Sequence, residues 1–469
     1  MAKKIIVRLA VVGLLAGIII SSFFHCTVGI LVITILLLAL ICWIGKRRQY
    51  IVLLLFFLLG WWRTNLMIVQ RPAMTKSLDI EAVVEYRDFV ADQQKLRLRS
   101  LTSPLPGAVI ASVAHFPVYN VGDIMRLRCT PQSSVAGSDI RLLRRDQMQG
   151  VAVRCRTSQV TFIRYQASWS TPFFRFKDYI ITTYDHLLPG PVAGLMQAMI
   201  VNERGGVSDD TTTNFSRSGL SHVVAISGMN MTLLIIAGRS FLTALGLRRK
   251  YSSSLLIVVL ILYVMIIGSP ASAVRAAVMS STLLIAQLVR RPVDIMHLLT
   301  LVAGVLAIIN PLAVVYDVGW QLSFLALTGL VWWTPWWTKV LSSVPERWSL
   351  RELMSATLAA QMFTWPLILY YFQVWPLWFL PANIVVVPLV GPIMIIGLLL
   401  PLIWWVPVIG SAASLIITLM IRWVLLVVTL VGTARWSVLP LPFSVVALIF
   451  SAGAMIIITK LINEKIYRH

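Results

Sequence analysis

The sequence predicts an α-helical polytopic membrane protein of about twelve spans. A small extracytoplasmic β-barrel domain is expected to be inserted after the third span. Of the 469 residues, 58% are hydrophobic and 12% are charged, and the mean hydropathy is +0.84. A soluble domain with one apolar helix does not reach such values. Apolar runs of about 20 residues, the length that crosses a bilayer, lie at 5–24, 28–45, 50–66, 221–246, 253–268, 271–289, 295–316, 319–338, 353–373, 379–404, 409–433 and 440–462.

Basic clusters predict the orientation of these spans, because Lys and Arg are enriched in cytoplasmic loops. Lys3-Lys4 precedes the first span, and Lys46-Arg47-Arg48 separates the second from the third. Later clusters fall at alternate turns, within 248–250, 290–291, 339–351 and 460–465. Both chain ends are therefore expected in the cytoplasm, with the polar stretch from 74 to 164 outside. The net charge of +22 follows the same rule and does not alone identify an anionic ligand.

Two details of the spans leave alternatives open. The first apolar run could be a secretory signal peptide, but His25 and Cys26 follow it without a small-residue cleavage site, so we expect it to be retained. The range 379–433 is crowded by Pro388, Pro392, Pro401 and Pro407, so it could contain a re-entrant segment. The chain then divides into N-terminal transmembrane helices (1–70), an outer β domain (71–165), an interfacial helical segment (166–220) and a transmembrane channel domain (221–469).

The outer β domain is predicted from short runs in which apolar and polar residues alternate. Such runs are typical of strands with one buried face. They lie at 80–86, 95–99, 109–113, 123–129 and 151–155. Five short strands in this length fit a small closed barrel of the oligonucleotide-binding (OB) type, although a short sandwich is also compatible.

Arginines alternate along these strands and are expected to share one face. The candidates for binding a phosphate backbone are Arg97, Arg99, Arg126, Arg128, Arg154 and Arg156. An exposed sheet face carrying Arg for solvation and edge protection is the alternative. Aromatic residues that could stack on bases are sparse and comprise Tyr86, Phe89, Phe116 and Tyr119.

The cysteines and the helical segment complete the outer region. Cys129 and Cys155 end two predicted strands on the oxidising side, so a disulfide is expected, with two buried thiols as the alternative. Cys26 and Cys42 lie in or beside apolar runs and are expected to pack there. Residues 167–186 predict an amphipathic helix at the outer interface, which either anchors the domain over a pore mouth or is an ordinary membrane-surface helix.

Polar residues interrupt several apolar spans, and such groups are tolerated where they face protein or a hydrated cavity. Arg275 follows a Gly-Ser-Pro break, and Asp317 is its candidate ion-pair partner. An alternative for His222 and the amides is that they cross-link helices, and for Ser227-Gly228 that they permit a helix break or a close helix approach. The candidate residues of a shared channel are His222, Ser227, Gly228, Asn230, Arg275, Asp317, Gln321 and Asn383.

A set of motifs in fixed order resembles the ComEC family of competence channels. The motifs are Gly194-Leu195-Met196, Asn202-Glu203-Arg204, 222–230, 268–279, 290–294, Asn310-Pro311-Leu312 and 317–324. The resemblance implies an inner-membrane channel that moves single-stranded DNA into the cytoplasm during natural transformation. It also implies three partners: an outer DNA receptor, a helicase-like motor and a separate nuclease.

Two departures from the family pattern bear on mechanism. Many relatives carry a second His where this chain has Asn230, and many continue into a metallo-β-lactamase-like nuclease domain that is not expected here. The six His residues form no His-x-His-x-Asp-His cluster, and no phosphate-binding loop of the Gly-x-x-x-x-Gly-Lys-Ser/Thr kind is present. We therefore expect no enzymatic activity, no cofactor and no metal. The alternatives are a transporter for a smaller anionic or lipid substrate and a membrane-embedded hydrolase using His222 with Ser227 or Asp317.

Overall fold

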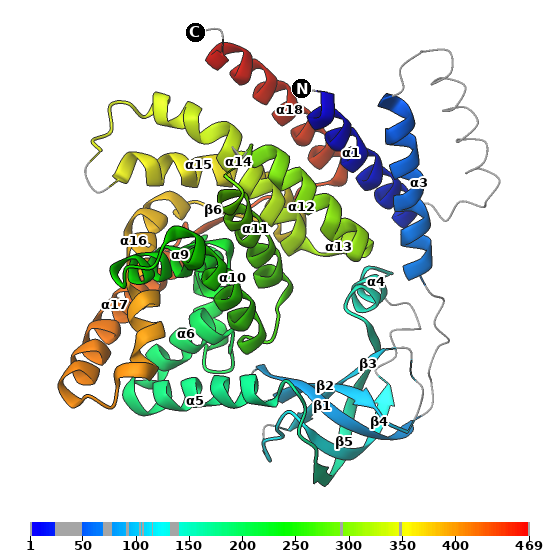
Figure 1. Cartoon of the computed structure of the whole chain (residues 1–469), viewed down its shortest axis with the longest axis vertical. Coiled ribbons are helices and arrows are strands. Elements are labelled where there is room, and N and C mark those ends of the chain that lie inside the picture. Colours follow the sequence, from blue (N-terminus) through cyan, green and yellow to red (C-terminus); the bar gives the residue numbers. More distant parts are fainter. Residues whose placement is uncertain are drawn as a thin grey trace. The chain divides into compact units, whose positions relative to one another are not determined.

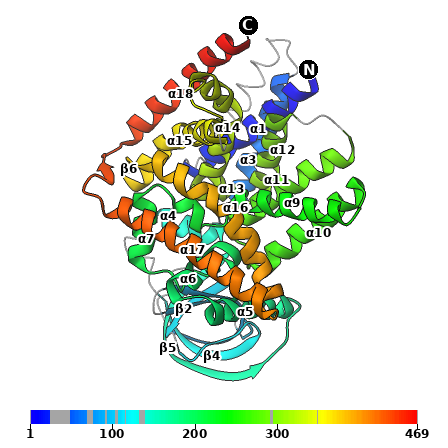
Figure 2. The ribbon, with the colours of Figure 1, turned by 90° about the vertical axis from the view of Figure 1, so that its left-hand side faces the viewer.

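The computed structural model describes residues 2–23, 49–68, 77–90, 93–102, 105, 107–114, 116–131, 140–290, 294–346 and 349–467. The chain divides into two compact units. Unit 1 comprises Met1–Thr171 and Val289–Gln321, and unit 2 comprises Pro172–Leu288 and Leu322–His469. Figures 1 and 2 display their elements from two directions.

Unit 1 contains a helical part and a β domain. Its elements are α1 (Ala2–Phe23), α3 (Gln49–Met67), β1 (Leu78–Val90), β2 (Gln93–Ser100), β3 (Ala108–Ala114), β4 (Asp123–Pro131), α4 (Ile140–Met148), β5 (Val151–Tyr165), α12 (Ile295–Ile309) and α13 (Pro311–Tyr316). Helix α14 (Val318–Val340) begins in unit 1 and continues into unit 2.

Unit 2 is helical apart from two short strands. Its elements are α5 (Thr171–Leu187), α6 (Gly190–Val201), α7 (Asp209–Arg217), α8 (Ser221–Val224), α9 (Gly228–Ala244), α10 (Arg249–Ile266), α11 (Ala271–Leu288), α15 (Leu350–Phe372), β6 (Val374–Pro376), α16 (Phe379–Ile403), α17 (Pro407–Thr433), β7 (Val438–Pro440) and α18 (Val445–Tyr467).

Six described helices are long and apolar enough to cross a membrane, as expected of a multi-pass membrane protein. They are Ile5–Phe23, Arg249–Ile266, Ala271–Leu288, Leu350–Phe372, Phe379–Ile403 and Pro407–Thr433. Shorter apolar helices occupy Val52–Met67, Gly190–Val201, Ile295–Ile309 and Val445–Lys460. The predicted span 28–45 lies outside the described residues, and the total of twelve spans stays a prediction.

Helices α1 and α3 of unit 1 pack at unusually close range. Gly13 and Gly17 lie one helical turn apart on α1, and a Cβ at either would clash with the α3 backbone at Leu53 or Phe57. Such pairs of small residues let helix backbones approach in a membrane, where van der Waals packing replaces the hydrophobic effect. Helix α1 also contacts the start of α12, where the Arg8 guanidinium lies 3.6 Å from the carboxylate of Asp294, the N-cap residue of α12.

The five strands of the β domain pair in the order β1-β2-β3-β5-β4, and β4 pairs back to β1. Alternate residues of each strand face inward, so Leu96, Leu98, Met125 and Leu127 are buried together with Ile80. This inward face is what the alternating sequence pattern predicts. All five predicted strands are present, and β5 extends ten residues beyond its predicted end at 155.

A disulfide joins two neighbouring strands of this domain, β4 and β5. Cys129 and Cys155 are bonded, with their Cα atoms 5.2 Å apart. Both side chains are buried, at 1% exposure. The bridge expected from the sequence is therefore present, and it closes the chain segment that contains α4.

Helix α4 was not predicted, and it connects the β domain to the helical part of unit 1. The Arg154 guanidinium on β5 donates two hydrogen bonds to the Asp146 carboxylate of α4, at 2.6 and 2.9 Å. At its other end, the Asn310 amide donates to the Met148 carbonyl at 3.0 Å. Asn310 lies between α12 and α13, where Pro311 begins a new helix.

Helix α6 forms the centre of unit 2. Every residue from Val192 to Val201 is buried, as expected for a helix that is apolar all round. The turn after α6 folds back on it so tightly that a Cβ at Gly194 would clash with the Gly206 backbone. This contact gives a physical reason for the glycines at both positions.

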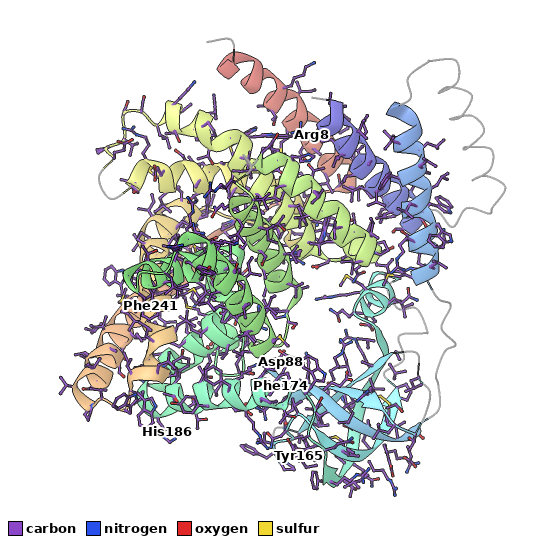
Figure 3. The ribbon with its side chains drawn as sticks, in the orientation of Figure 1. Arg8, Asp88, Tyr165, Phe174, His186 and Phe241 are labelled. Atoms are coloured by element: carbon purple, nitrogen blue, oxygen red, sulfur yellow. A yellow bond between two sulfur atoms is a disulfide. The ribbon has the colours of Figure 1, made fainter. Side chains whose placement is uncertain are left out.

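Helix α5 lies against α16, and a tyrosine of α5 replaces a helical hydrogen bond that a proline of α16 cannot make. Pro401 has no N–H, so the carbonyl four residues earlier, at Gly397, loses its helical partner. The Tyr184 hydroxyl donates to that carbonyl at 2.9 Å, and the Tyr179 hydroxyl donates to the Pro401 carbonyl at 2.8 Å. Burial raises the pKa of Tyr184, so its hydroxyl remains protonated as a donor. In Figure 3, Phe174 marks the beginning of α5 and His186 its end.

The prolines of 379–433 do not create a re-entrant segment. Helix α16 continues through Pro388, Pro392 and Pro401, and α17 begins at Pro407. The two helices therefore match the predicted spans 379–404 and 409–433 within a few residues. By contrast, the predicted spans 221–246 and 295–316 are each divided into two helices.

Candidate functional site

The first candidate feature is the break between α8 and α9. Ala225 and Ser227 both have extended backbones, so α8 ends and α9 starts anew at Gly228. A Cβ added at Gly228 would meet no atom within 4 Å. The predicted helix break is therefore present, whereas Gly228 makes no close helix contact and faces open space.

His222 lies in α8, just before this break. The residue is exposed. Its imidazole contacts the backbone carbonyl of Gly219, three residues earlier. The contact is local, so it does not cross-link distant helices.

Asn230 and Tyr263 bind the carbonyl end of α6. The Asn230 amide donates to the Met199 carbonyl at 3.4 Å, and the Tyr263 hydroxyl donates to the Ile200 carbonyl at 2.7 Å. The last carbonyls of a helix have no partner within it, and these side chains replace that partner. Asn230 is fully buried, so it cross-links helices, which was one of the two alternatives that the sequence left open.

Ser227 completes the first turn of α9. Its hydroxyl donates to the side-chain oxygen of Asn230 at 3.4 Å. The hydroxyl thus helps to orient the buried amide. This bond directs the hydroxyl toward Asn230.

The second candidate feature is the break between α10 and α11. Like the first break, it lies close to a side chain that binds the carbonyl end of α6. Gly268 and Ser269 both have positive φ angles, which end α10 and start α11 at Ala271. Because Tyr263, one turn before this break, and Asn230 bind consecutive carbonyls of α6, the N-termini of α9 and α11 begin in one region. Helix N-termini carry partial positive charge and unpaired N–H groups.

Arg275 lies in the second turn of α11 and is 5% exposed. Its guanidinium donates to the Ser323 hydroxyl at 3.4 Å. Asp317 belongs to unit 1, and the ion pair expected between it and Arg275 stays a prediction.

The remaining two candidates bond to backbone near their own positions. The Gln321 amide donates to the carbonyls of Val314 and Val315 at 3.0 and 2.9 Å, so it caps the end of α13 in unit 1. The Asn383 amide donates to the Phe379 carbonyl at 2.6 Å, within α16. Helix α16 contacts α9 in unit 2.

The segment that contains both breaks has an unusual charge composition. From Thr211 to Val293 the chain has no Asp or Glu. Its basic residues are Arg217, Arg239, Arg248, Arg249, Lys250, Arg275, Arg290 and Arg291. A path lined with cations and helix N-termini favours anions. The lack of acidic residues is visible in the sequence, but no short motif marks it, and it was not among the predictions.

A buried ion pair in unit 2 was missed from sequence. Lys177 on α5 lies 2.9 Å from Glu203, and the side chains are 3% and 6% exposed. Nearby, the Gln197 amide donates to the Asp185 carboxylate at 2.7 Å. Buried charges require such partners. In the sequence, Glu203 was noted only within Asn202-Glu203-Arg204, one of the motifs that resemble the ComEC family, and no role was predicted for it.

Four of the six candidate arginines of the β domain are exposed and two, Arg97 and Arg154, are partly buried, and most of the six have protein partners. Arg99 lies 3.1 Å from Glu85, Arg126 pairs with Glu81, and Arg154 pairs with Asp146. Arg97 donates to the Gln149 carbonyl at 3.1 Å. Hydrogen bonding and the charge of Glu81 raise the pKa of Arg126. These pairs favour the solvation alternative for half of the candidates.

Arg128 and Arg156 differ from the other four. Both are exposed, and the described part of the chain records no ion pair for either. The extended end of β5 adds two exposed aromatic residues, Phe162 at 53% and Tyr165 at 42%. The sequence analysis missed these because it ended the strand at 155. Figure 3 labels Tyr165 at the end of this strand.

Among the described residues, no group of three His, Cys, Asp or Glu side chains is placed to hold a metal ion.

The six long apolar helices define the class of protein, a multi-pass membrane protein. A family model described as Competence protein matches residues 199–465, and the chain therefore belongs to this ComEC-type competence family. Over 214 residues it is 31% identical to ComE operon protein 3 of Bacillus subtilis (strain 168), covering 45% of this chain. The match spans 26% of that relative's length. No solved structure matches the chain.

Proposed function

We propose that this protein is an inner-membrane channel that carries single-stranded DNA into the cytoplasm during natural transformation. The observation that carries the proposal is the segment from Thr211 to Val293, which lacks acidic residues and contains two broken helices. A nucleic acid strand presents one negative charge per nucleotide, and hydrocarbon cannot solvate it. The segment supplies cations, helix N-termini and open space at Gly228 without competing carboxylates.

The β domain is proposed to lie outside and to receive the strand, with both chain termini in the cytoplasm. Its strand order is that of a five-stranded barrel of the OB type, a fold that binds oligonucleotides on an exposed face. Arg128 and Arg156 would contact phosphates, and Phe162 and Tyr165 would stack on bases. An outer DNA receptor, a cytoplasmic helicase-like motor and a separate nuclease are proposed as partners.

The two alternatives fit the site less well. A transporter for a smaller anion or lipid would use the cations but gives the β domain no role. A hydrolase would need the Ser227 hydroxyl beside a base, and that hydroxyl instead donates to Asn230. The proposal therefore rests on charge and on open helix breaks rather than on a catalytic pair.

The deciding experiment measures labelled DNA that reaches the cytoplasm of a transformable cell whose only copy of this gene is deleted or restored. We expect import only with the gene present. Unchanged import in the deletion strain would remove the proposed function. Import of a small anion or lipid in place of DNA would favour the transporter.

A further inference from the structure

One cation of the membrane helices remains unexplained by the proposed path. Arg239 lies in α9, and its guanidinium donates to the side-chain oxygen of Gln287 on α11 at 2.9 Å. The Arg239 side chain is partly buried. Its Nε atom is buried and has no hydrogen-bond partner in the described part of the chain. The structure also records no ion pair for Arg239 among those residues.

This arrangement leaves a positive charge held by a neutral amide. An Arg inside a membrane-spanning helix costs about 2.5 to 3.5 kcal/mol on insertion scales. No carboxylate is available within α9, α10 or α11, because none of the three helices contains one. Ionisable residues retained in such positions mark ion and substrate pathways by default.

Arg239 also lies on the same face of α9 as the open break. Gly228, Thr232, Ile235, Arg239 and Thr243 follow each other at spacings of three or four residues, which places them along one stripe. Thr232 and Thr243 are both exposed on it. The stripe therefore carries Gly228, two threonines and Arg239, interrupted by Ile235, which packs against the apolar cluster of α9 to α11.

The position of Gln287 supports the same geometry from α11. Arg239 lies eleven residues after Gly228, or about 16 Å along the helix axis. Gln287 lies sixteen residues after Ala271, where α11 begins, or about 24 Å along its own axis. The two helices therefore meet at the Arg239–Gln287 contact, well beyond the breaks.

We propose that Arg239, positioned by Gln287, is a second phosphate-binding station on the path, about three helical turns beyond the break at Gly228 and on the cytoplasmic side. This inference rests on the proposed function and adds a site to it. The guanidinium presents a planar fork that matches a phosphate group. Gln287 occupies one donor of the guanidinium, and its remaining Nη–H groups are left for the passing anion. The strand would then transfer from the region of Arg275 to Arg239 before it leaves the membrane.

The test measures import of labelled single-stranded DNA by cells that express the full chain. We expect Arg239→Gln to lower the import rate about tenfold, the effect of losing one charge-assisted hydrogen bond, and Arg239→Lys to keep most of it. Lys339→Gln is the matched control, because Lys339 is an exposed cation in the last turn of α14, outside the segment from Thr211 to Val293, and its loss should leave import unchanged. Membrane abundance of each variant is measured in parallel.

A double variant separates anion binding from a structural contact. If Arg239 and Gln287 only join two helices, Arg239→Met with Gln287→Met replaces both polar partners by apolar ones and restores import. If Arg239 binds phosphate, the double variant remains as slow as Arg239→Gln. Restored import would therefore overturn the inference.

Photocrosslinking gives an independent readout that needs no rate change. A crosslinker at Thr243, on the stripe, should capture DNA arrested during import. A crosslinker at Phe241, which Figure 3 labels, should not, because that side chain is 64% exposed and the helical spacing places it on the opposite face of α9 from the stripe. Equal capture at both positions would overturn the inference, as would normal import by Arg239→Gln. Absence of DNA import by the unmodified protein would instead overturn the proposed function.

Discussion

The β domain and the helices α9 to α11 both carry excess positive charge, but they hold it differently. In the β domain, Arg99, Arg126 and Arg154 face carboxylates within ion-pair distance. In α9 to α11 there is no carboxylate at all. Exposed ion pairs in water contribute little to stability, whereas a cation in a membrane helix is costly. For Arg239, which has only the Gln287 amide as a partner among the described residues, the proposed counterion is an anion from outside the chain.

The largest expected effect on DNA import comes from removing the Arg275 guanidinium of α11. Arg275→Ala should reduce DNA import by about a hundredfold or more, because several charge-assisted hydrogen bonds to the strand are lost. DNA capture at the cell surface and membrane abundance should stay normal, since the β domain is untouched. Transformation frequency and surface-bound label are measured on the same cells. Normal transformation by this variant would end the assignment of Arg275 to the path.

The next largest effect concerns the stability of the β domain itself. Replacing Cys129 and Cys155 by Ser should lower its unfolding free energy by about 3 kcal/mol, because the bridge closes a loop that constrains the unfolded chain. Hydrogen exchange of the β4 and β5 amides in the full-length protein measures the change. Replacing Cys26 and Cys42 by Ser is the control and should leave that exchange unaltered. Two free thiols in mass spectra of oxidised protein would contradict the bridge.

The elements that the sequence predicted well are those with a local cause. An apolar run fixes a span by its length, so α10, α15 and α16 lie within a few residues of their predicted ranges. Alternation fixed the five strands in the same way. Helix α4 was missed because it is short and polar, and α6 was not distinguished from the interfacial segment around it. Its burial depends on α5, α16 and α17, which are distant in sequence.

The candidate site divides along the same line. Gly and Pro predicted the breaks before α9 and α11, because these residues act on the backbone where they occur. The partners of Asn230 and Tyr184 could not be predicted, since they lie 31 and 213 residues away in the sequence. Arg239 was visible as a charge in an apolar run, yet its importance depends on Gln287, which only the packing of α9 on α11 reveals.

A smaller effect should distinguish arginines of the β domain that have carboxylate partners from those that do not. Arg128→Gln or Arg156→Gln should weaken binding of single-stranded DNA to the purified full-length protein. Each should also reduce the slope of log affinity against log salt by about one, as for a lost phosphate contact. Arg99→Gln is the matched control, because its guanidinium lies 3.1 Å from Glu85. Equal slopes for all three variants would mean that partners do not decide which arginines meet DNA.

The smallest effect reverses that logic by releasing an arginine that is already paired. Glu81→Gln removes the carboxylate from Arg126 but leaves an amide of the same shape on the exposed face. Because exposed pairs contribute between about 0 and 1 kcal/mol, the unfolding free energy should hardly change. The released guanidinium should raise the affinity for single-stranded DNA about twofold at low salt, and the gain should disappear as salt increases. If affinity stays constant at every salt concentration, Arg126 lies away from the DNA strand. The proposed DNA-binding residues of the β domain are then limited to the arginines near β5.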